Sequence, residues 1–352
     1  MRTARILGQG RSFYHCMSRV VDRRFIFGAE EKEFFRKTMR QLEAFLGVRV
    51  VTYALMSNHF HLLLEVPARP MDDEEVHGWL TPEELLRRLP FLYDEPAVRE
   101  VREELERAAA AGSERWVRQI LAPFERRMLD LSVFLKELKQ RFTQWYNRRK
   151  KRRGTLWEER FKSVLVEDCE EALLLMAAYI DINPVRAGLA DDPKDYRWCG
   201  YGEAVAGGAL ARKGLCRILE AAGEVTSPPG ERYRAAWRLT TARYRLLLYR
   251  RGEENHGDEF GRGIRRGFSV DEIELEEARN GLLSCAEALR CRVRYLCDGA
   301  VLGTSEFVEN VFQANRERFG PRRKEGPRPM RGADWGELCV IRDLRLRAIE
   351  TS

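Results

Sequence analysis

The sequence lacks any apolar run long enough to cross a membrane. Its longest plainly apolar stretch, residues 172–180, is far shorter than the roughly 20 residues that a membrane-spanning helix needs. The N-terminal residues turn polar at once and show no apolar core with a cleavage site, so we expect no secretory signal and a cytoplasmic protein. With 352 residues, 44% of them hydrophobic, the chain predicts a globular protein of two or three domains.

Cysteine pairs and nucleotide-binding loops are also missing. Eight cysteines are scattered along the chain without a Cys-x-x-Cys pair, and there are only five histidines. We therefore expect neither a zinc ribbon nor a disulfide framework, and we interpret the cysteines as reduced, mostly buried thiols. No Walker phosphate loop stands out, so no nucleotide cofactor is expected.

Basic residues are in slight excess, and part of that excess is concentrated in one block. Lysine and arginine total 62 against 55 acidic residues, a net charge of +7, which permits nucleic-acid binding without establishing it. Six consecutive basic residues, the basic block, are Arg148, Arg149, Lys150, Lys151, Arg152 and Arg153, followed by Arg160 and Lys162. Six phosphate contacts predict a salt slope of about 4 on single strands. A solvated helix end is the alternative.

The hydrophobic patterns predict an α+β fold in the first half of the chain. We expect strands at residues 13–20, 48–55, 58–66 and 162–167, the second and third forming an antiparallel pair, and helices at 30–46, ended by Gly47, 129–150, ended by Gly154, and 170–182, stopped by Asn183-Pro184. The strongly charged residues 67–130 predict a helical insertion opened by Thr81-Pro82.

The domain boundaries follow from shifts in composition. We expect a first domain at residues 1–201, a helical extension at 202–250, a Gly/Arg-rich linker at 251–267 and a mainly helical region of unknown role at 268–352. Helices are predicted there at 233–249, 269–297 and 305–319. Between the last two, residues 298–303 indicate a helix-turn-helix that reads DNA or, alternatively, a plain helical hairpin.

The sharpest motif is the tripeptide His59-Phe60-His61 in the third predicted strand. Alternate side chains of a strand share a face, so both imidazoles point one way and Phe60 points the other. A single divalent metal could then reach both imidazoles. The alternative is a pair of surface or hydrogen-bonded histidines without a metal.

Tyr179 and Asn183 form a second candidate pair. They are i and i+4, so a persisting helix would place a phenol and a neutral oxygen ligand on one face. An ordinary half-buried packing tyrosine is the alternative. Tyr146 is the competing nucleophile, since Trp145-Tyr146-Asn147 directly precedes the basic block, but no oxygen ligand follows it at i+4. Trp145 and Trp157 are expected either to stack on bases or to be buried under the helices.

Together these motifs resemble the REP-associated tyrosine transposases, IS200-like members of the single-tyrosine superfamily with a His-hydrophobic-His metal motif. The resemblance spans about residues 11–201. It is carried by Tyr14-His15-x-x-Ser18-Arg19, His59-Phe60-His61, Gly154-x-Leu156-Trp157-x-x-Arg160-Phe161-Lys162 and Tyr179-x-x-x-Asn183-Pro184-x-x-Ala187-Gly188.

The resemblance implies a ferredoxin-like or RRM-like antiparallel sheet backed by helices, and an enzyme that nicks and rejoins DNA. It implies that Tyr179 is the nucleophile, forming a covalent 5′-phosphotyrosine, and that His59, His61 and Asn183 bind Mg²⁺ or Mn²⁺. Of the two ions, Mn²⁺ accepts imidazole ligands more readily. The implied partner is single-stranded or hairpin DNA, held by Arg19 and the basic residues named above; no membrane partner is expected, and a homodimer stays open.

The weak acidity of a tyrosine hydroxyl supports a role for a metal ion in the reaction. A phenol with a pKa near 10 is only about 0.3% ionised near pH 7.5, so a cation that polarises the phosphate and offsets developing charge is useful. Two rival readings stay open: a domesticated, non-catalytic DNA-binding or regulatory protein on the same fold, and a metal-dependent hydrolase, which leaves Tyr179 and the basic block unexplained. The helical insertion makes the interval from His61 to Tyr179 longer than in compact family members, and residues 202–352 carry none of the motifs.

Overall fold

The computed structural model describes residues 5–70, 78–221, 289, 292–321, 323–331, 333–341 and 349–350. The chain divides into two compact units, Leu7–Lys162 and a second unit formed by Met1–Ile6 with Ser163–Ser352. The predicted first domain, residues 1–201, thus contributes to both units, and the predicted linker, 251–267, lies outside the described residues. The predicted α+β class is confirmed.

The unit Leu7–Lys162 is built on a three-stranded antiparallel sheet in the order β2-β3-β1. The strands are β1 (Ser12–Arg19), β2 (Arg49–Leu55) and β3 (His59–Val66), close to the predicted bounds. In the β1–β3 register, Met17 lies opposite His61 and Arg19 opposite His59. Residues that face each other across an antiparallel pair share one side of the sheet, so odd-numbered residues of both strands lie on the same face.

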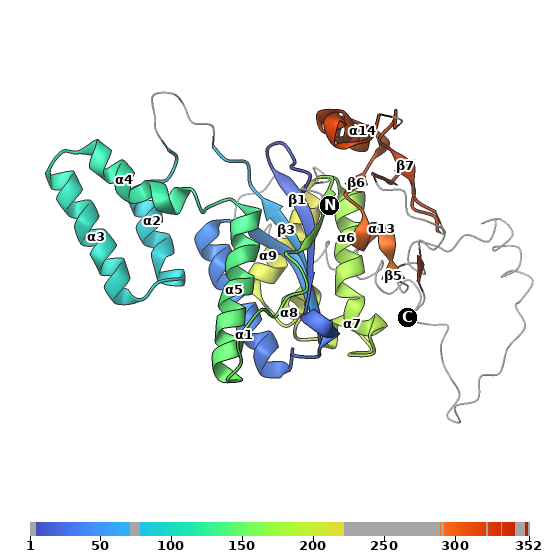
Figure 1. Ribbon diagram of the computed structural model, residues 1–352, viewed down its shortest axis with the longest axis horizontal. Helices are drawn as coiled ribbons and strands as arrows, with labels where there is room; N and C mark the ends of the chain where they lie inside the picture. Colours follow the sequence, from blue (N-terminus) through green and yellow to red (C-terminus); the bar gives the residue numbers. More distant parts are fainter. Residues whose placement is uncertain are drawn as a thin grey trace, which may run out of the picture. The chain divides into compact units, whose positions relative to one another are not determined.

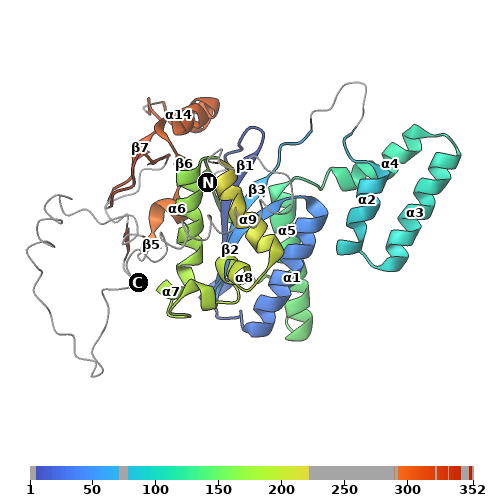
Figure 2. The ribbon, with the colours of Figure 1, turned by 180° about the vertical axis from the view of Figure 1, so that it is seen from behind.

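Helices α1 (Ala29–Leu46) and α5 (Leu131–Arg149) lie side by side over one face of this sheet (Figures 1 and 2). Gly47 ends α1 as predicted, at a φ of +76° that glycine adopts without strain, and its N–H bonds to the carbonyl of Glu43. Phe60, on the even-numbered face of β3, packs under these helices against Phe35 and Trp157. The core of this unit therefore occupies the sheet face opposite the histidines.

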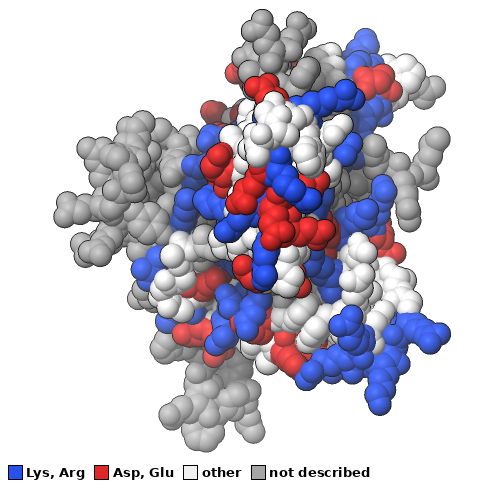
Figure 3. Space-filling view, turned by 90° about the vertical axis from the view of Figure 1, so that its left-hand side faces the viewer, with Lys and Arg blue, Asp and Glu red and all other residues white. Residues whose placement is uncertain are grey.

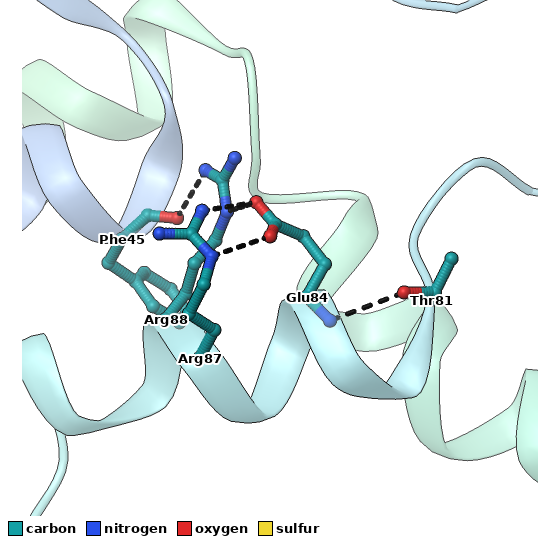
Figure 4. A network of polar contacts seen from close by, with 5 residues as sticks. All are labelled: Phe45, Thr81, Glu84, Arg87 and Arg88. Carbon is teal, nitrogen blue, oxygen red and sulfur yellow. Dashed lines mark hydrogen bonds and ion pairs between the residues drawn. The ribbon is translucent and has the colours of Figure 1, made fainter.

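The predicted helical insertion consists of α2 (Pro82–Arg88), the 3₁₀ turn η2 (Leu89–Phe91), α3 (Glu95–Ala110) and α4 (Glu114–Glu125). The hydroxyl of Thr81 accepts a hydrogen bond from the N–H of Glu84, so the predicted cap is confirmed. Figure 4 shows how Arg88 joins the insertion to α1: it donates to Glu84 at 2.5 Å and to the carbonyl of Phe45 at 3.3 Å. Glu84 also accepts two hydrogen bonds from Arg87, which lower its pKa from 4.5 to about 2.

In the second unit, strand β4 (Lys162–Val166) is followed by α6 (Glu170–Asp181) and the one-turn helix α7 (Asn183–Arg186). We predicted that Asn183-Pro184 stops the helix. That prediction was wrong in one respect: α6 ends at Asp181, but the chain resumes a helical turn at Asn183. Pro184 is tolerated there because it occupies the first turn, where its missing N–H has no partner to lose.

The remaining described elements of this unit are η3 (Pro193–Asp195), α8 (Gly200–Val205), α9 (Ala209–Ala221), α13 (Arg294–Asp298), α14 (Ser305–Ala314), η4 (Arg316–Arg318) and the short strands β5 (Arg292–Val293), β6 (Val301–Gly303), β7 (Arg328–Pro329), β8 (Cys339–Val340) and β9 (Ile349–Glu350). Buried Asp181 accepts the N–H of Tyr201 at 3.1 Å, which fastens the end of α6 to α8. The strands follow the order β4-β6-β8-β7, and β5 pairs with β9.

The interpretation of residues 298–303 as a helix-turn-helix, and the alternative of a helical hairpin, were both wrong. These residues contain the end of α13 and the strand β6, which pairs in parallel with β4 and antiparallel with β8. Val301 and Leu302 are buried, so the apolar residues between two helices serve a sheet rather than a turn. Of the other predicted helices, 305–319 is confirmed as α14 and η4, 233–249 and 269–288 lie outside the described residues, and 292–297 holds β5 and most of α13.

The cysteines agree with a reduced interior. All six that the structure describes are free thiols; Cys16, Cys199, Cys216 and Cys297 are buried and two others are half-buried. No helix in the described ranges is long and apolar enough to cross a membrane.

Candidate functional site

The two histidines of the tripeptide share a sheet face, as their spacing predicted. The ring centroids of His59 and His61 are 5.0 Å apart, with the rings nearly perpendicular. His59, at the start of β3, is half-buried, whereas His61 is only 2% exposed. Phe60 is fully buried on the opposite face. The sheet thus presents two imidazoles together, with a rigid aromatic core behind them.

Arg19 adds a positive charge to this face. It lies directly opposite His59 in the β1–β3 register. Its Nε is buried and has no hydrogen-bond partner among the described residues. A buried guanidinium nitrogen without a partner is costly, because the group has lost water and gained nothing in exchange. An oxyanion that accepts this hydrogen bond would remove that cost.

The basic block divides into two groups of three. Arg149 and Lys150 form ion pairs with Glu30 and Glu31 of α1, at 2.7 Å and 3.1 Å. Arg152 donates to the side chain of Asn147 and the carbonyl of Thr155. The side chains of the other three are exposed and make no hydrogen bond or ion pair with any residue that the structure describes: Arg148, Lys151 and Arg153.

Acidic side chains are interspersed among the basic ones on the face seen in Figure 3, which carries the helical insertion. That face is therefore not a continuous basic surface, and it offers a nucleic acid less attraction than a surface of one sign would. Within the basic block, the side chains of Arg148, Lys151 and Arg153 are the ones that no carboxylate matches within 4 Å in the described chain.

Lys139, buried beneath the segment that follows the basic block, fastens that segment to α5. Its ammonium donates to the carbonyl of Glu159 at 2.7 Å and also to the carbonyl of Arg160. Burial lowers the pKa of Lys139 to about 8.

Trp157 is buried against Phe27, Phe60 and Phe142, and its indole N–H donates to Thr143. Of the two alternatives for Trp157, burial is therefore the one observed.

Exposed Arg160 and Lys162 flank this anchored segment. Trp145 is half-buried and stacks on Phe34 at a centroid distance of 4.2 Å, so one of its ring faces is already occupied. Tyr146, the competing nucleophile, is half-buried near Phe142, with the ammonium of Lys150 5.9 Å from its ring centroid.

Tyr179 lies in the last turn of α6 and is 1% exposed. Its hydroxyl lies 2.5 Å from the sulfur of Cys297 in α13 and forms a hydrogen bond with it. Burial raises the pKa of the Tyr179 hydroxyl well above its ordinary value, and Cys297 raises it further. The guanidinium of Arg186, 5.1 Å from the ring centroid, acts in the opposite direction. In this conformation the hydroxyl is closed to solvent, and its raised pKa favours the neutral phenol.

Asn183 folds back onto the helix that carries Tyr179. Its side-chain nitrogen donates to the carbonyls of Tyr179 and Ile180, at 2.7 Å and 3.2 Å. These bonds fix the orientation of the amide, because only the nitrogen can donate to a carbonyl. The amide oxygen is then the atom that could ligate a cation. The i, i+4 spacing thus brings the side chain of Asn183 into contact with the backbone carbonyl of Tyr179.

The donor set on the histidine face fits a divalent cation in part. It supplies two imidazoles, which suit Mn²⁺ better than Mg²⁺ because magnesium prefers oxygen ligands. Within the described part of the chain, no group of three or more His, Cys, Asp or Glu residues is arranged to hold a metal. The other ligands of such a cation would be oxygens: an amide, a DNA phosphate, or water.

Two residues near these groups were not assigned a role from the sequence. His15 is buried on the histidine face, since it lies on β1 at an odd-numbered position. Arg186 lies beside the ring of Tyr179, seven residues along the chain. Both lie within the motifs that carry the resemblance. The two-residue period of a strand could have placed His15 on the histidine face, and the seven-residue spacing of two helical turns could have placed Arg186 near Tyr179.

Comparison with protein families matches residues 10–72 to the family described as "Transposase IS200 like". The match covers β1 to β3, with both histidines and Arg19, and confirms the predicted resemblance over that range. Tyr179, Asn183 and the basic block lie beyond it.

Among solved structures, the chain is similar to one described as "Structure of the REP associates tyrosine transposase bound to a REP hairpin". The sequences are 14% identical, the alignment covers 59% of this chain and 87% of that one, and the TM-score is 0.37, which is a weak similarity. No curated protein matches the chain.

Proposed function

We propose that this protein is a metal-dependent transposase that nicks and joins single-stranded DNA through a covalent 5′-phosphotyrosine at Tyr179. The observation that carries the proposal is the pair of imidazoles on one face of an antiparallel sheet, beside the unpartnered Nε of Arg19. These residues lie within the stretch that matches the IS200-like transposase family.

His59 and His61 would hold the cation, with the amide oxygen of Asn183 as an oxygen ligand. When bound, a divalent cation polarises the scissile phosphate and offsets the charge that develops during attack. Arg19 would donate its Nε hydrogen to a phosphate oxygen, which supplies the partner that this buried group lacks.

Tyr179 would attack the phosphorus through its hydroxyl oxygen. The bond between phosphorus and the 3′ oxygen breaks, the leaving strand keeps a 3′-hydroxyl, and the protein keeps the 5′-phosphate as an ester of Tyr179. The number of phosphoester bonds is unchanged, so rejoining needs no nucleotide cofactor. Arg186, beside the ring, favours the phenolate that the attack requires.

The DNA partner is proposed from charge. The side chains of Arg148, Lys151 and Arg153 in the basic block offer positive charge to a phosphate backbone without first breaking an ion pair, and exposed Arg160 and Lys162 lie farther along the same segment. Such contacts position a strand without reading its sequence. Single-stranded or hairpin DNA is the form whose backbone and bases are both accessible to a nicking enzyme.

The test is a covalent adduct. The full chain is incubated with single-stranded and hairpin oligonucleotides from the flanks of its own gene and Mn²⁺, and a denaturing gel reports protein-bound DNA. Tyr179→Phe should abolish the adduct and leave DNA binding nearly unchanged, because only the attacking oxygen is lost. Adduct formation by Tyr179→Phe, with its loss in Tyr146→Phe, would overturn the assignment.

A second candidate function is a DNA-binding protein that has kept this fold without catalysis. The burial of Tyr179 and its bond to Cys297 favour it, since a nucleophile must reach its phosphate. Specific hairpin binding without any adduct, under either metal, would support this second function.

A further inference from the structure

Three of the five histidines of the chain lie on one sheet face, and two of them are in direct contact. His15 lies on β1, two residues before Met17, which is the residue opposite His61. His15 is 1% exposed. Its Nε2 is 2.9 Å from the Nδ1 of His61. The two rings are stacked, with centroids 5.1 Å apart and planes 15° from parallel. The contact joins two ring nitrogens in hydrogen-bonding geometry, so it constrains the hydrogen positions of both neutral rings.

A neutral imidazole carries one hydrogen, on either Nδ1 or Nε2. If the shared hydrogen is on Nδ1 of His61, the Nε2 of that ring keeps a lone pair that can bind a cation. If it is on Nε2 of His15 instead, Nδ1 of His61 accepts, Nε2 of His61 carries the hydrogen, and that nitrogen cannot be a ligand. Cation binding at Nε2 of His61 therefore needs the first arrangement, in which His15 is the acceptor.

His59 provides an independent indication of the arrangement on this face. Its Nδ1 is 2.7 Å from the side-chain oxygen of Asn58. The amide nitrogen of Asn58 donates to the carbonyl of Arg23, which fixes the oxygen toward the imidazole. An amide oxygen only accepts, so Nδ1 of His59 carries the hydrogen and Nε2 the lone pair. The same tautomer in both rings would direct both Nε2 atoms to one ion.

We propose that His15 is a positioning residue for the metal ligand His61. Its Nε2 accepts the hydrogen of His61 Nδ1, and this bond fixes the tautomer and the ring orientation in which His61 binds the cation. Histidine ligands of metals usually donate their second ring hydrogen to such an acceptor, and loss of the acceptor typically weakens metal binding about 10- to 100-fold. The inference rests on the proposed role of His59 and His61 as ligands.

The test compares two variants of similar size. In His15→Gln the amide oxygen reaches about as far as Nε2 and can accept the hydrogen of His61, whereas His15→Met fills the space without a comparable acceptor. Mn²⁺ binding to the full chain without DNA is titrated through the electron paramagnetic resonance signal of the free ion. We expect His15→Met to bind about 10- to 100-fold more weakly than the wild type and His15→Gln to bind within a few-fold of it. Equal binding by the wild type and a folded His15→Met would overturn the inference and leave the proposed function standing.

A second measurement is made on the wild type without metal, with one variant used only to assign the signals. Two-bond proton–nitrogen spectra of protein labelled with ¹⁵N-histidine, with His61 assigned through His61→Gln, report which nitrogen is protonated. We expect hydrogen on Nδ1 of His61; hydrogen on its Nε2 would overturn the inference. If the wild type shows the expected tautomer but binds no Mn²⁺ even with DNA present, the metal role in the proposed function fails, and the positioning role fails with it.

Discussion

His59 keeps part of its imidazole at the surface of a rigid sheet, whereas Tyr179 is 1% exposed and bonded to Cys297. The first group, His59, lies opposite Arg19 in the β1–β3 register, and the buried Nε of Arg19 has no hydrogen-bond partner in the described chain. The second has its hydrogen-bonding groups occupied within its own unit. If Tyr179 acts as the proposed nucleophile, attack requires it to leave Cys297, whereas the proposed ligand His59 is already partly open to solvent.

The largest expected effect is on the histidine face. His59→Ala combined with His61→Ala should abolish cleavage and Mn²⁺ binding, because both imidazole ligands are lost. Phe60→Leu is the matched control on the other face of the same strand: it should lower the free energy of unfolding by about 1–3 kcal/mol and leave cleavage intact below the melting temperature. Cleavage by the double variant, or by the wild type in EDTA, would rule out the metal role.

The next effect concerns the division of the basic block. Replacing Arg148, Lys151 and Arg153 with glutamine should lower the salt slope of single-strand binding by about 2, at roughly 0.7 per lost phosphate contact. The same change at Arg149, Lys150 and Arg152 should lower it less, because these residues already have partners in the protein. Affinity is measured between 50 and 200 mM salt. Equal slopes for the two triple variants would mean that the ion pairs do not decide which residues meet DNA.

A smaller effect is expected at the contact that holds the nucleophile. Cys297→Ala removes the partner of the Tyr179 hydroxyl, whereas Cys297→Ser keeps a hydroxyl there. A hydrogen bond of about 0.5–1.5 kcal/mol corresponds to a roughly two- to tenfold faster formation of the covalent adduct by the alanine variant. The rate of adduct formation with one oligonucleotide under single-turnover conditions is the measurement. A serine variant that reacts faster than the alanine variant would show that this contact does not restrain Tyr179.

The smallest effect is on the helical insertion and depends on pH. The pKa of Glu84 is lowered from 4.5 to about 2, so above pH 4.5 its charge stabilises the fold, and that contribution is lost as pH falls from about 4.5 toward 2. Chemical unfolding at pH 6 and pH 3.5 should therefore show a smaller difference between wild type and Glu84→Gln at the lower pH. Exposed Glu83→Gln is the control in the same helical turn. A difference that grows toward acid would contradict the assignment.

Much of the fold could be predicted because local patterns decide it. The short apolar run in residues 58–66 and the glycine after α1 predicted β3 and the end of α1 within a residue or two. The prediction for residues 298–303, which contain β6, was wrong for a different reason. The three residues of β6 become a strand only through pairing with β4 and β8, which are distant in the sequence, so nothing local distinguishes them from a turn between helices.

For the candidate site, the sequence could predict the types of residue and the strand or helix face on which each lies, but not their contacts. The spacing of His59 and His61 gave their common face, but the contact of His15 with His61 depends on the register of β1 against β3, which the sequence does not state. Likewise, the partner of Tyr179 lies 118 residues along the chain, and no periodicity connects it to Cys297.

The central claim, that Tyr179 is the nucleophile, is tested most directly by locating the DNA on the protein. After reaction with an oligonucleotide and Mn²⁺, the adduct is digested with nuclease and trypsin and analysed by tandem mass spectrometry. Complete cleavage after lysine and arginine yields a peptide of residues 163–186, in which Tyr179 is the only tyrosine, and a peptide of residues 142–148, which carries Tyr146. We predict a nucleotide mass on Tyr179 in the first peptide. The same mass on Tyr146 in the second, with Tyr179 unmodified, would contradict the account.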